Sequence, residues 1–170
     1  MTITELMNGK ETNPSYKGIL TTDDYVLAIN TDPTNQTPKK DNEYHVLEKG
    51  VKGYPSNLNP KEKTRQFIRG GEQTVVLSKQ ATYNVTGVRF VGDEAQDFLL
   101  GYKVMFGVGQ DVITDYIYFD IKTGNGWKGK CSISVNSIAE GEAGDDAGFS
   151  CSLKGTEIAP KEWSYQSLPA

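Results

Sequence analysis

Few residues in this chain of 170 have the types needed for catalysis, and they do not form a recognisable catalytic set. The single histidine, His45, lies in a polar stretch without a cysteine or serine motif beside it. A histidine in such a loop is most often simply solvated. The signatures of serine hydrolases, zinc proteases, phosphate-binding loops and redox-active cysteine pairs do not occur. We therefore expect no enzyme activity and assign no catalytic residue.

An acidic run in the last third of the chain, Glu140-Gly-Glu142-Ala-Gly-Asp145-Asp146, supplies oxygens that could bind calcium or form a carboxylate pair. The order of the residues is not that of an EF-hand loop, and flanking helices are not expected. Adjacent Asp145 and Asp146 point in different directions on an extended chain, so they do not make an acid and base pair by themselves. We interpret the run as a solvated hairpin loop and predict no metal and no cofactor.

Two cysteines, Cys131 and Cys151, lie on two expected neighbouring strands and could approach each other. The amino terminus lacks the basic and apolar segments of a signal peptide, and no apolar run approaches the ~20 residues that span a bilayer. We therefore expect a protein that is made and kept in a cytoplasm, without a membrane partner. This compartment favours two reduced, buried thiols.

The net charge of −4 argues against a surface dedicated to nucleic acid, because such surfaces need clustered lysine and arginine. It does not exclude DNA passing nearby. Glutamates interleave with the two small basic groups and cancel much of their field. Solvent exposure or charge pairing with another subunit is the use that we expect of these groups, which are Lys39-Lys40 and Lys61, Lys63 and Arg65.

Residues 85–112 change from a strand pattern to a helix pattern and back, and the rest of the chain is organised around them. Asp93 is the expected helix N-cap, and Gln96 completes a capping-box-like arrangement with it. Glycines 107 and 109 end the helix. One face of the helix carries the apolar residues of an i, i+3, i+4, i+7 pattern, which are Ala95, Phe98, Leu99 and Tyr102.

Strand patterns account for most of the remaining ordered chain. We expect strands at residues 25–31, 66–68, 74–77, 82–90, 114–121, 128–137 and 149–154. The strand at 128–137 carries Cys131, Ile133 and Val135 inward, and the last strand matches it, so the two should pair as a long hairpin. The predicted fold is mainly β: a barrel or sandwich with one short flanking α-helix and a long extended loop or hairpin. The length suits a single domain, residues 1–170.

Residues 34–65 form a long polar excursion in which glycine, proline and asparagine keep interrupting any core pattern. A loop of this length in a compact domain is usually functional or disordered, and we favour a function. Its apolar side chains have no obvious core of their own, so a neighbouring subunit is expected to cover them. The predicted subunit-interface residues are Tyr44, Val46, Leu47, Val51, Tyr54 and Arg65. The C-terminal tail, residues 157–170, contains Trp163 and Tyr165. We expect these aromatic side chains to pack against a protein surface.

The order of these elements resembles the major tail tube proteins of long-tailed, siphophage-type bacteriophages. The residues that carry the resemblance are an early strand ending in AINTDPTNQTP, the excursion EYHVLEKGVKGYPSNLNPKEKTRQFI, the strand–helix–turn TGVRFVGDEAQDFLLGYKVMFGVGQDV and the final glycine-turn hairpin with its acidic loop. Together they cover about residues 24–156. The resemblance implies a barrel or sandwich with one helix on its flank.

In function, the resemblance implies a virion structural protein. Such a subunit self-assembles into stacked hexameric rings that form the tail tube, the conduit for DNA during ejection. Residues 34–65 would reach an adjacent subunit or the next ring. The implied partners are further copies of the chain and other tail proteins such as the tape measure and the tail terminator, with DNA only as passing cargo. The implied location is the virion tail, after assembly in the host cytoplasm.

Two other functions fit the sequence. One is the inner-tube protein of a contractile tail or secretion machine, which shares the fold type. The other is a monomeric β-sandwich module that binds a small or sugar ligand, for which a concave aromatic patch is required. Tyr116 and Tyr118 are the residues that we expect in such a patch.

Overall fold

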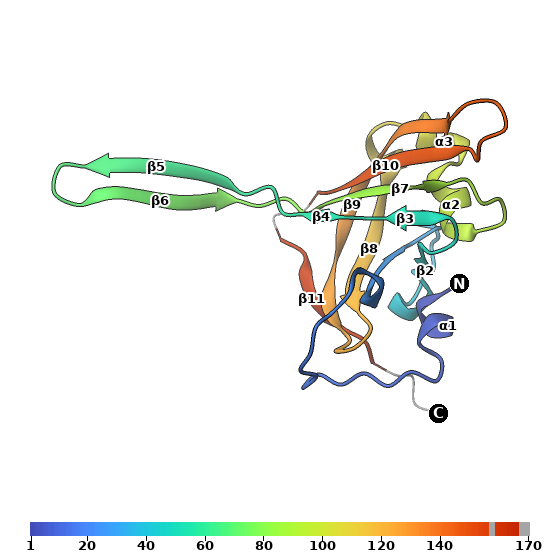
Figure 1. The fold of residues 1–170 in the computed structure, drawn as a ribbon, viewed down its shortest axis with the longest axis horizontal. Coiled ribbons are helices and arrows are strands. Elements are labelled where there is room, and N and C mark those ends of the chain that lie inside the picture. Colours follow the sequence, from blue (N-terminus) through green and yellow to red (C-terminus); the bar gives the residue numbers. More distant parts are fainter. Residues whose placement is uncertain (157–158, 167–170) are drawn as a thin grey trace.

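A computed structural model describes residues 1–156 and 159–166, so residues 157–158 and 167–170 of the predicted tail lie outside the described residues. The mainly β class is confirmed: one curled sheet makes a half-barrel, and a two-stranded arm projects from it (Figure 1). The α-helices are α1 (Ile3–Met7), α2 (Glu94–Leu99) and α3 (Tyr102–Met105). The strands are β1 (Tyr25–Ile29), β2 (His45–Val46), β3 (Val51–Gly53), β4 (Ser56–Asn57), β5 (Lys61–Phe67), β6 (Gly71–Ser78), β7 (Thr82–Val88), β8 (Ile113–Asp120), β9 (Asn125–Glu140), β10 (Gly148–Gly155) and β11 (Lys161–Ser164).

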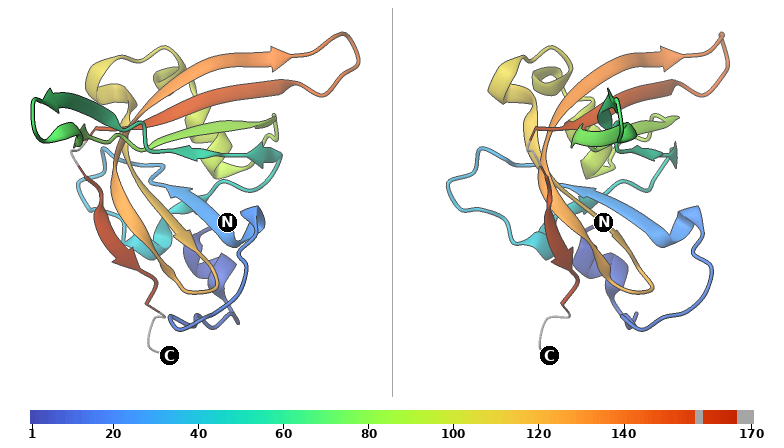
Figure 2. Two further views of the ribbon diagram at one scale, coloured as in Figure 1. Left: turned by 60° about the vertical axis from the view of Figure 1, so that its left-hand side comes forward. Right: turned by 90° about the vertical axis from the view of Figure 1, so that its left-hand side faces the viewer.

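The main sheet runs in the order β2-β1-β8-β9-β10-β7-β3, with β11 added to β9 and β4 added to β7. All the neighbouring strands are antiparallel. The two rotated views in Figure 2 show the sheet curling around α2 and α3 on one side. The predicted hairpin of β9 and β10 is confirmed by the pairs Val135–Cys151 and Ile133–Leu153.

Alternation along β1 and β8 divides the apolar residues between two cores. The larger core lies inside the curl, where Leu27, Tyr116 and Tyr118 meet β7, β9, β10 and the helices. The smaller core lies on the other face of β1 and β8, where Ile117 and Phe119 pack with residues of α1 and with Tyr44 and Val46. Both faces of these strands are therefore covered, which explains the unbroken apolar and aromatic run at residues 116–119 of β8.

The C-terminal segment docks on the protein's own sheet. Strand β11 pairs with the start of β9, and the Trp163 ring meets the Phe119 ring edge-on at 5.1 Å between centroids. The Trp163 Nε1 donates a hydrogen bond of 2.9 Å to the Asp41 carboxylate. Tyr165 also packs against the smaller core. The expected docking of Trp163 and Tyr165 is thus satisfied within one subunit.

The helix predicted after β7 exists but is broken in two. Asp93 caps α2 by accepting a hydrogen bond from the Gln96 amide, as predicted. Gly101 then serves as the N-cap of the separate helix α3, so the apolar period does not continue. As a result Tyr102, expected on the buried face, is 80% exposed. Helices α1 and α3 are additions to the one flanking helix that we predicted.

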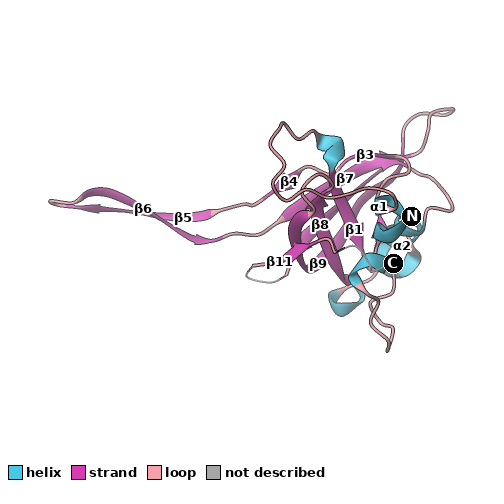
Figure 3. Ribbon diagram, turned by 90° about the horizontal axis from the view of Figure 1, so that it is seen from below, coloured by secondary structure: helices cyan, strands magenta, loops and turns pink. Residues whose placement is uncertain are grey.

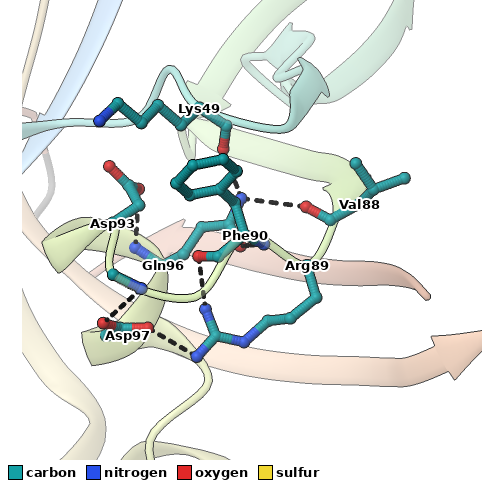
Figure 4. Close-up of polar contacts among 8 residues, drawn as sticks. Lys49, Val88, Arg89, Phe90, Asp93, Gln96 and Asp97 are labelled. Carbon is teal, nitrogen blue, oxygen red and sulfur yellow. Dashed lines mark hydrogen bonds and ion pairs between the residues drawn. The ribbon is translucent and has the colours of Figure 1, made fainter. Parts of the chain in front are cut away.

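Gln96 has a different partner from the one that a capping box requires. Its fully buried amide donates to the carbonyls of Lys49 and Val88 and accepts from the Phe90 amide (Figure 4). Gly50 completes this contact, because a Cβ there would lie 2.5 Å from the Val88 carbonyl oxygen. One side chain thereby ties α2 to the end of β7 and to the loop before β3.

Candidate assembly surface

Three of the six predicted interface residues are buried within the subunit. Tyr44, Val46 and Leu47 are 2%, 3% and 1% exposed. The premise that the excursion has no core of its own is wrong here, because the chain returns to the sheet at β2, which pairs with β1 through Ala28–Val46 and Ile29–His45. Two-residue strands are too short to be recognised from periodicity. These side chains are therefore not free to contact a neighbour.

Val51 and Tyr54 are half-buried and pack against the larger core. The Tyr54 hydroxyl donates a hydrogen bond of 2.7 Å to the carbonyl of Tyr25 on β1. Tyr25 and Tyr54 also line an open groove of about 620 Å³, to which residues of β1 and β3 contribute. Of the six predicted interface residues, only Arg65 lies on a freely projecting element.

That element is the arm, residues 61–78, made of β5 and β6. It extends well beyond the body of the molecule (Figures 1 and 3). Every residue from 55 to 80 is exposed. An isolated two-stranded hairpin is at best marginally stable in water, so a hairpin of this length calls for a partner surface.

The arm exposes large apolar side chains that nothing in the described chain covers. Ile68 at the tip is 103% exposed, which is the value of a fully solvated side chain. Soluble monomers seldom leave apolar groups clustered in this way, and such clusters usually mark a site of protein association. The other exposed apolar residues of the arm are Phe67, Val75, Val76 and Leu77.

These apolar arm residues were missed because residues 66–68 and 74–77 were expected to be strands of the body. They do form strands, but strands of the arm. A signal was available: β5 reads KEKTRQF, which has charged or polar side chains on both faces. A strand buried in a body needs at least one apolar face, so this composition indicates a projecting strand.

Tyr116 and Tyr118 do not form the exposed aromatic patch that a ligand-binding module requires. Tyr116 and Tyr118 are 1% and 8% exposed and stack among Tyr25, Tyr83 and Trp127 in the larger core. Burial raises the pKa of Tyr118 to about 12. Residues 116 and 118 are thus core residues, and our expectation that they would form an exposed concave patch is wrong.

The residues considered for chemistry are dispersed. Our interpretation of His45 as solvated is wrong: its side chain is 12% exposed, and its Nδ1 lies 2.6 Å from the Glu94 carboxylate. Burial lowers the pKa of His45, and Glu94 only partly offsets this effect.

Cys131 and Cys151 are free and buried, and burial raises the pKa of both thiols. Within residues 1–156 and 159–166, no three His, Cys, Asp or Glu side chains are arranged to hold a metal ion.

None of the helices in the described part of the chain has the length and apolar composition needed to cross a membrane.

No known protein family profile matches the sequence, and no curated protein does either. Solved structures with a similar fold include two chains of gene transfer agent particles. A chain from the tail of an empty gene transfer agent particle, refined helically with C6 symmetry, is 12% identical with a TM-score of 0.55, and the match covers 87% of this chain and 100% of that chain. A chain from the virion of a native gene transfer agent particle is 13% identical with a TM-score of 0.52, over 86% of this chain and 100% of the other. The protein therefore shares its fold with chains of assembled gene transfer agent particles.

Proposed function

We propose that this protein is a structural subunit of a phage-type tail, which assembles with further copies of itself into stacked hexameric rings forming a tail tube. The arm is the observation that carries this proposal. It is a long, fully exposed hairpin with uncovered apolar residues, attached to a body that has its own two cores. The fold shared with chains of tail particles, one of them refined with C6 symmetry, supports the same function.

The physical basis of assembly is the transfer of the arm from water to a neighbouring subunit. Full burial of an aliphatic or aromatic side chain contributes roughly 1.5–3 kcal/mol. Association of two subunits opposes this with a cost of roughly 4–15 kcal/mol in lost freedom of motion. One arm contact is thus weak by itself, whereas a closed ring lets each subunit give an arm and receive one.

In the proposed tube, the subunit acts by position and shape, and it needs no catalytic group or cofactor. DNA would pass through the tube without being bound. The net charge of −4 suits this role, because a modestly acidic protein repels phosphates and does not retain them. Further tail proteins, such as a tape measure and a terminator, would set the length and the end of the tube within the virion.

Electron microscopy of the purified protein tests this function. We expect rings or hollow tubes in negative stain above a threshold concentration, and fast-sedimenting material in the same samples. The arm makes nucleation concentration-dependent, so the series should run upward from a dilute, monomeric sample. Monomers at every concentration, with and without crowding agents that promote assembly, would contradict the proposal.

A further inference from the structure

The strand register of the arm sorts its side chains onto two faces. Residues directly opposite each other on paired strands share a face, and successive residues alternate between faces. Lys63 is opposite Val75, Arg65 is opposite Gln73, and Phe67 is opposite Gly71. We call this side the basic face, because it carries two cations and no anion beside the apolar Phe67 and Val75.

The other side of the arm is different in charge. Its cross-strand pairs are Glu62–Val76, Thr64–Thr74 and Gln66–Glu72. The Thr64 and Thr74 hydroxyls are 3.0 Å apart and hydrogen-bonded, which confirms that paired residues lie on one side. This acidic face carries two anions and no cation. The arm is therefore a ribbon with oppositely charged sides, and only the basic face combines charge with an aromatic side chain.

A complementary surface exists at the turn between β9 and β10. It carries four exposed carboxylates, and the segment from residue 131 to residue 153 contains no lysine or arginine. Ile138, at the end of β9, is 49% exposed and adds an apolar group. The turn is held in shape by the Glu142 amide, which donates to the Asp145 carboxylate at 3.0 Å. The carboxylates are those of Glu140, Glu142, Asp145 and Asp146.

The two surfaces cannot meet within one subunit. The arm extends to the left of the body in Figure 1, and the β9–β10 turn lies at the right-hand side. A repeating contact between two different patches of the same chain is head-to-tail, and such contacts generate rings or stacked assemblies. A head-to-tail contact requires complementary surfaces at opposite ends of the subunit. Here the two surfaces have opposite charge, and each also carries an apolar group.

We propose that the basic face of the arm binds the acidic β9–β10 turn of a second copy of this chain. Lys63 and Arg65 pair with the turn carboxylates, while Phe67 and Val75 cover Ile138. The acidic face then points away from the contact. This inference rests on the proposed function and adds to it the two surfaces that join, with Arg65 kept as an interface residue.

Charge reversal and compensation test the contact. In Lys63→Glu/Arg65→Glu the basic face becomes acidic, and we expect the critical concentration for assembly to rise about tenfold or more. Adding Glu142→Lys/Asp146→Lys to the same chain restores opposite charges and leaves the Asp145 carboxylate that shapes the turn, so assembly should return to within about threefold of the wild type. All four positions are exposed, so circular dichroism and thermal melting should match the wild type in every variant.

The control places new charge on the other side of the same ribbon. Glu62→Lys/Glu72→Lys reverses two charges on the acidic face without placing like charges directly opposite each other, and assembly should not weaken. If Lys63→Glu/Arg65→Glu assembles at the wild-type concentration, the inference is overturned. It is also overturned if the only defect of this variant is weaker DNA binding. Loss of assembly without rescue, beside a normal control, would overturn the turn as the partner while the proposed function stands. Failure of the wild type to assemble would instead remove the proposed function.

Discussion

Leu47 and Ile68 show how much the position of an aliphatic residue matters in this protein. Each directly follows another apolar residue within a largely polar segment, yet Leu47 is 1% exposed and Ile68 is 103% exposed. The difference arises from strand pairing: the segment of Leu47 returns to β1, where the Leu47 amide donates to the Leu27 carbonyl at 2.9 Å, and Ile68 lies at the end of a hairpin. Leu47 therefore stabilises the monomer, whereas Ile68 is available to a partner.

Alanine substitutions at these two positions should separate the two roles. Leu47→Ala leaves a cavity in the larger core and should lower the free energy of unfolding by roughly 2–5 kcal/mol. Ile68→Ala should change it by no more than about 0.5 kcal/mol, because the side chain contacts only solvent. Urea denaturation of dilute, monomeric protein measures both. Equal stability losses in the two variants would show that the assignment of Leu47 to the core and Ile68 to the surface is incorrect.

His45 gives the monomer a pH-dependent stability. Burial lowers the pKa of His45 below its ordinary value of 6.5 in the folded state. Between the lowered value and 6.5 the unfolded chain binds more protons than the folded one, so the free energy of unfolding decreases as the pH falls through this window. Above pH 6.5, His45 is neutral in both states, and the stabilising contribution of its neutral form to the free energy of unfolding is fully present.

We expect His45→Gln to flatten the pH dependence between pH 8 and pH 5. Urea denaturation of wild type and variant at several pH values in this range measures the two slopes. The acidic groups Glu5 and Asp24 have lowered pKa values and act at lower pH, so they leave this comparison intact. Parallel slopes for the two proteins, or a wild type that gains stability as the pH falls, would refute the assignment.

At the scale of elements, the sequence predicts individual strands and helices better than their partners. The hairpin of β9 and β10, the inward position of Cys131 and Cys151, and the Asp93 cap could all be predicted, because each depends on local periodicity or on a turn. The short strands β2, β3 and β4 could not, because pairing with distant strands defines them. The same non-local pairing hid the core position of residues 44–47 and the boundary of the arm.

Gln96 illustrates an element held by one side chain. Its buried amide makes three hydrogen bonds, and Gln96→Ala leaves the Val88 carbonyl and the Phe90 amide without these partners. We expect a loss of roughly 1–3 kcal/mol in the free energy of unfolding, together with faster amide exchange in α2. Gln110→Ala, at an exposed position, is the matched control and should be neutral. Unchanged exchange in α2 would show that Gln96 does not anchor the helix.

At the scale of the whole molecule, the charge of −4 conceals an uneven distribution. The arm carries Lys61, Lys63, Arg65 and Arg69 against Glu62 and Glu72, so it is net positive, whereas the β9–β10 turn is entirely acidic. Composition predicts a modestly acidic protein. It could not predict that basic and acidic segments lie at opposite ends, since that depends on the path of the chain through the sheet (Figure 1).

The base of the arm is closed, so the arm can be removed cleanly. The Gln80 amide donates to the Leu58 carbonyl at 2.8 Å, and the Asn59 side chain donates to the Thr82 hydroxyl at 2.8 Å. Replacement of residues 61–78 by a short glycine-serine linker keeps these contacts and both cores. We therefore expect the shortened protein to melt like the wild-type monomer.

The measurement that tests the account most directly is sedimentation of this arm-deleted protein beside the wild type at the same concentrations, with negative-stain images of both. The account predicts rings or tubes from the wild type, and a folded monomer at every concentration from the deletion, because the subunit then has no arm to place on its neighbour. Rings or tubes formed by the arm-deleted protein would contradict the claim that the arm drives assembly.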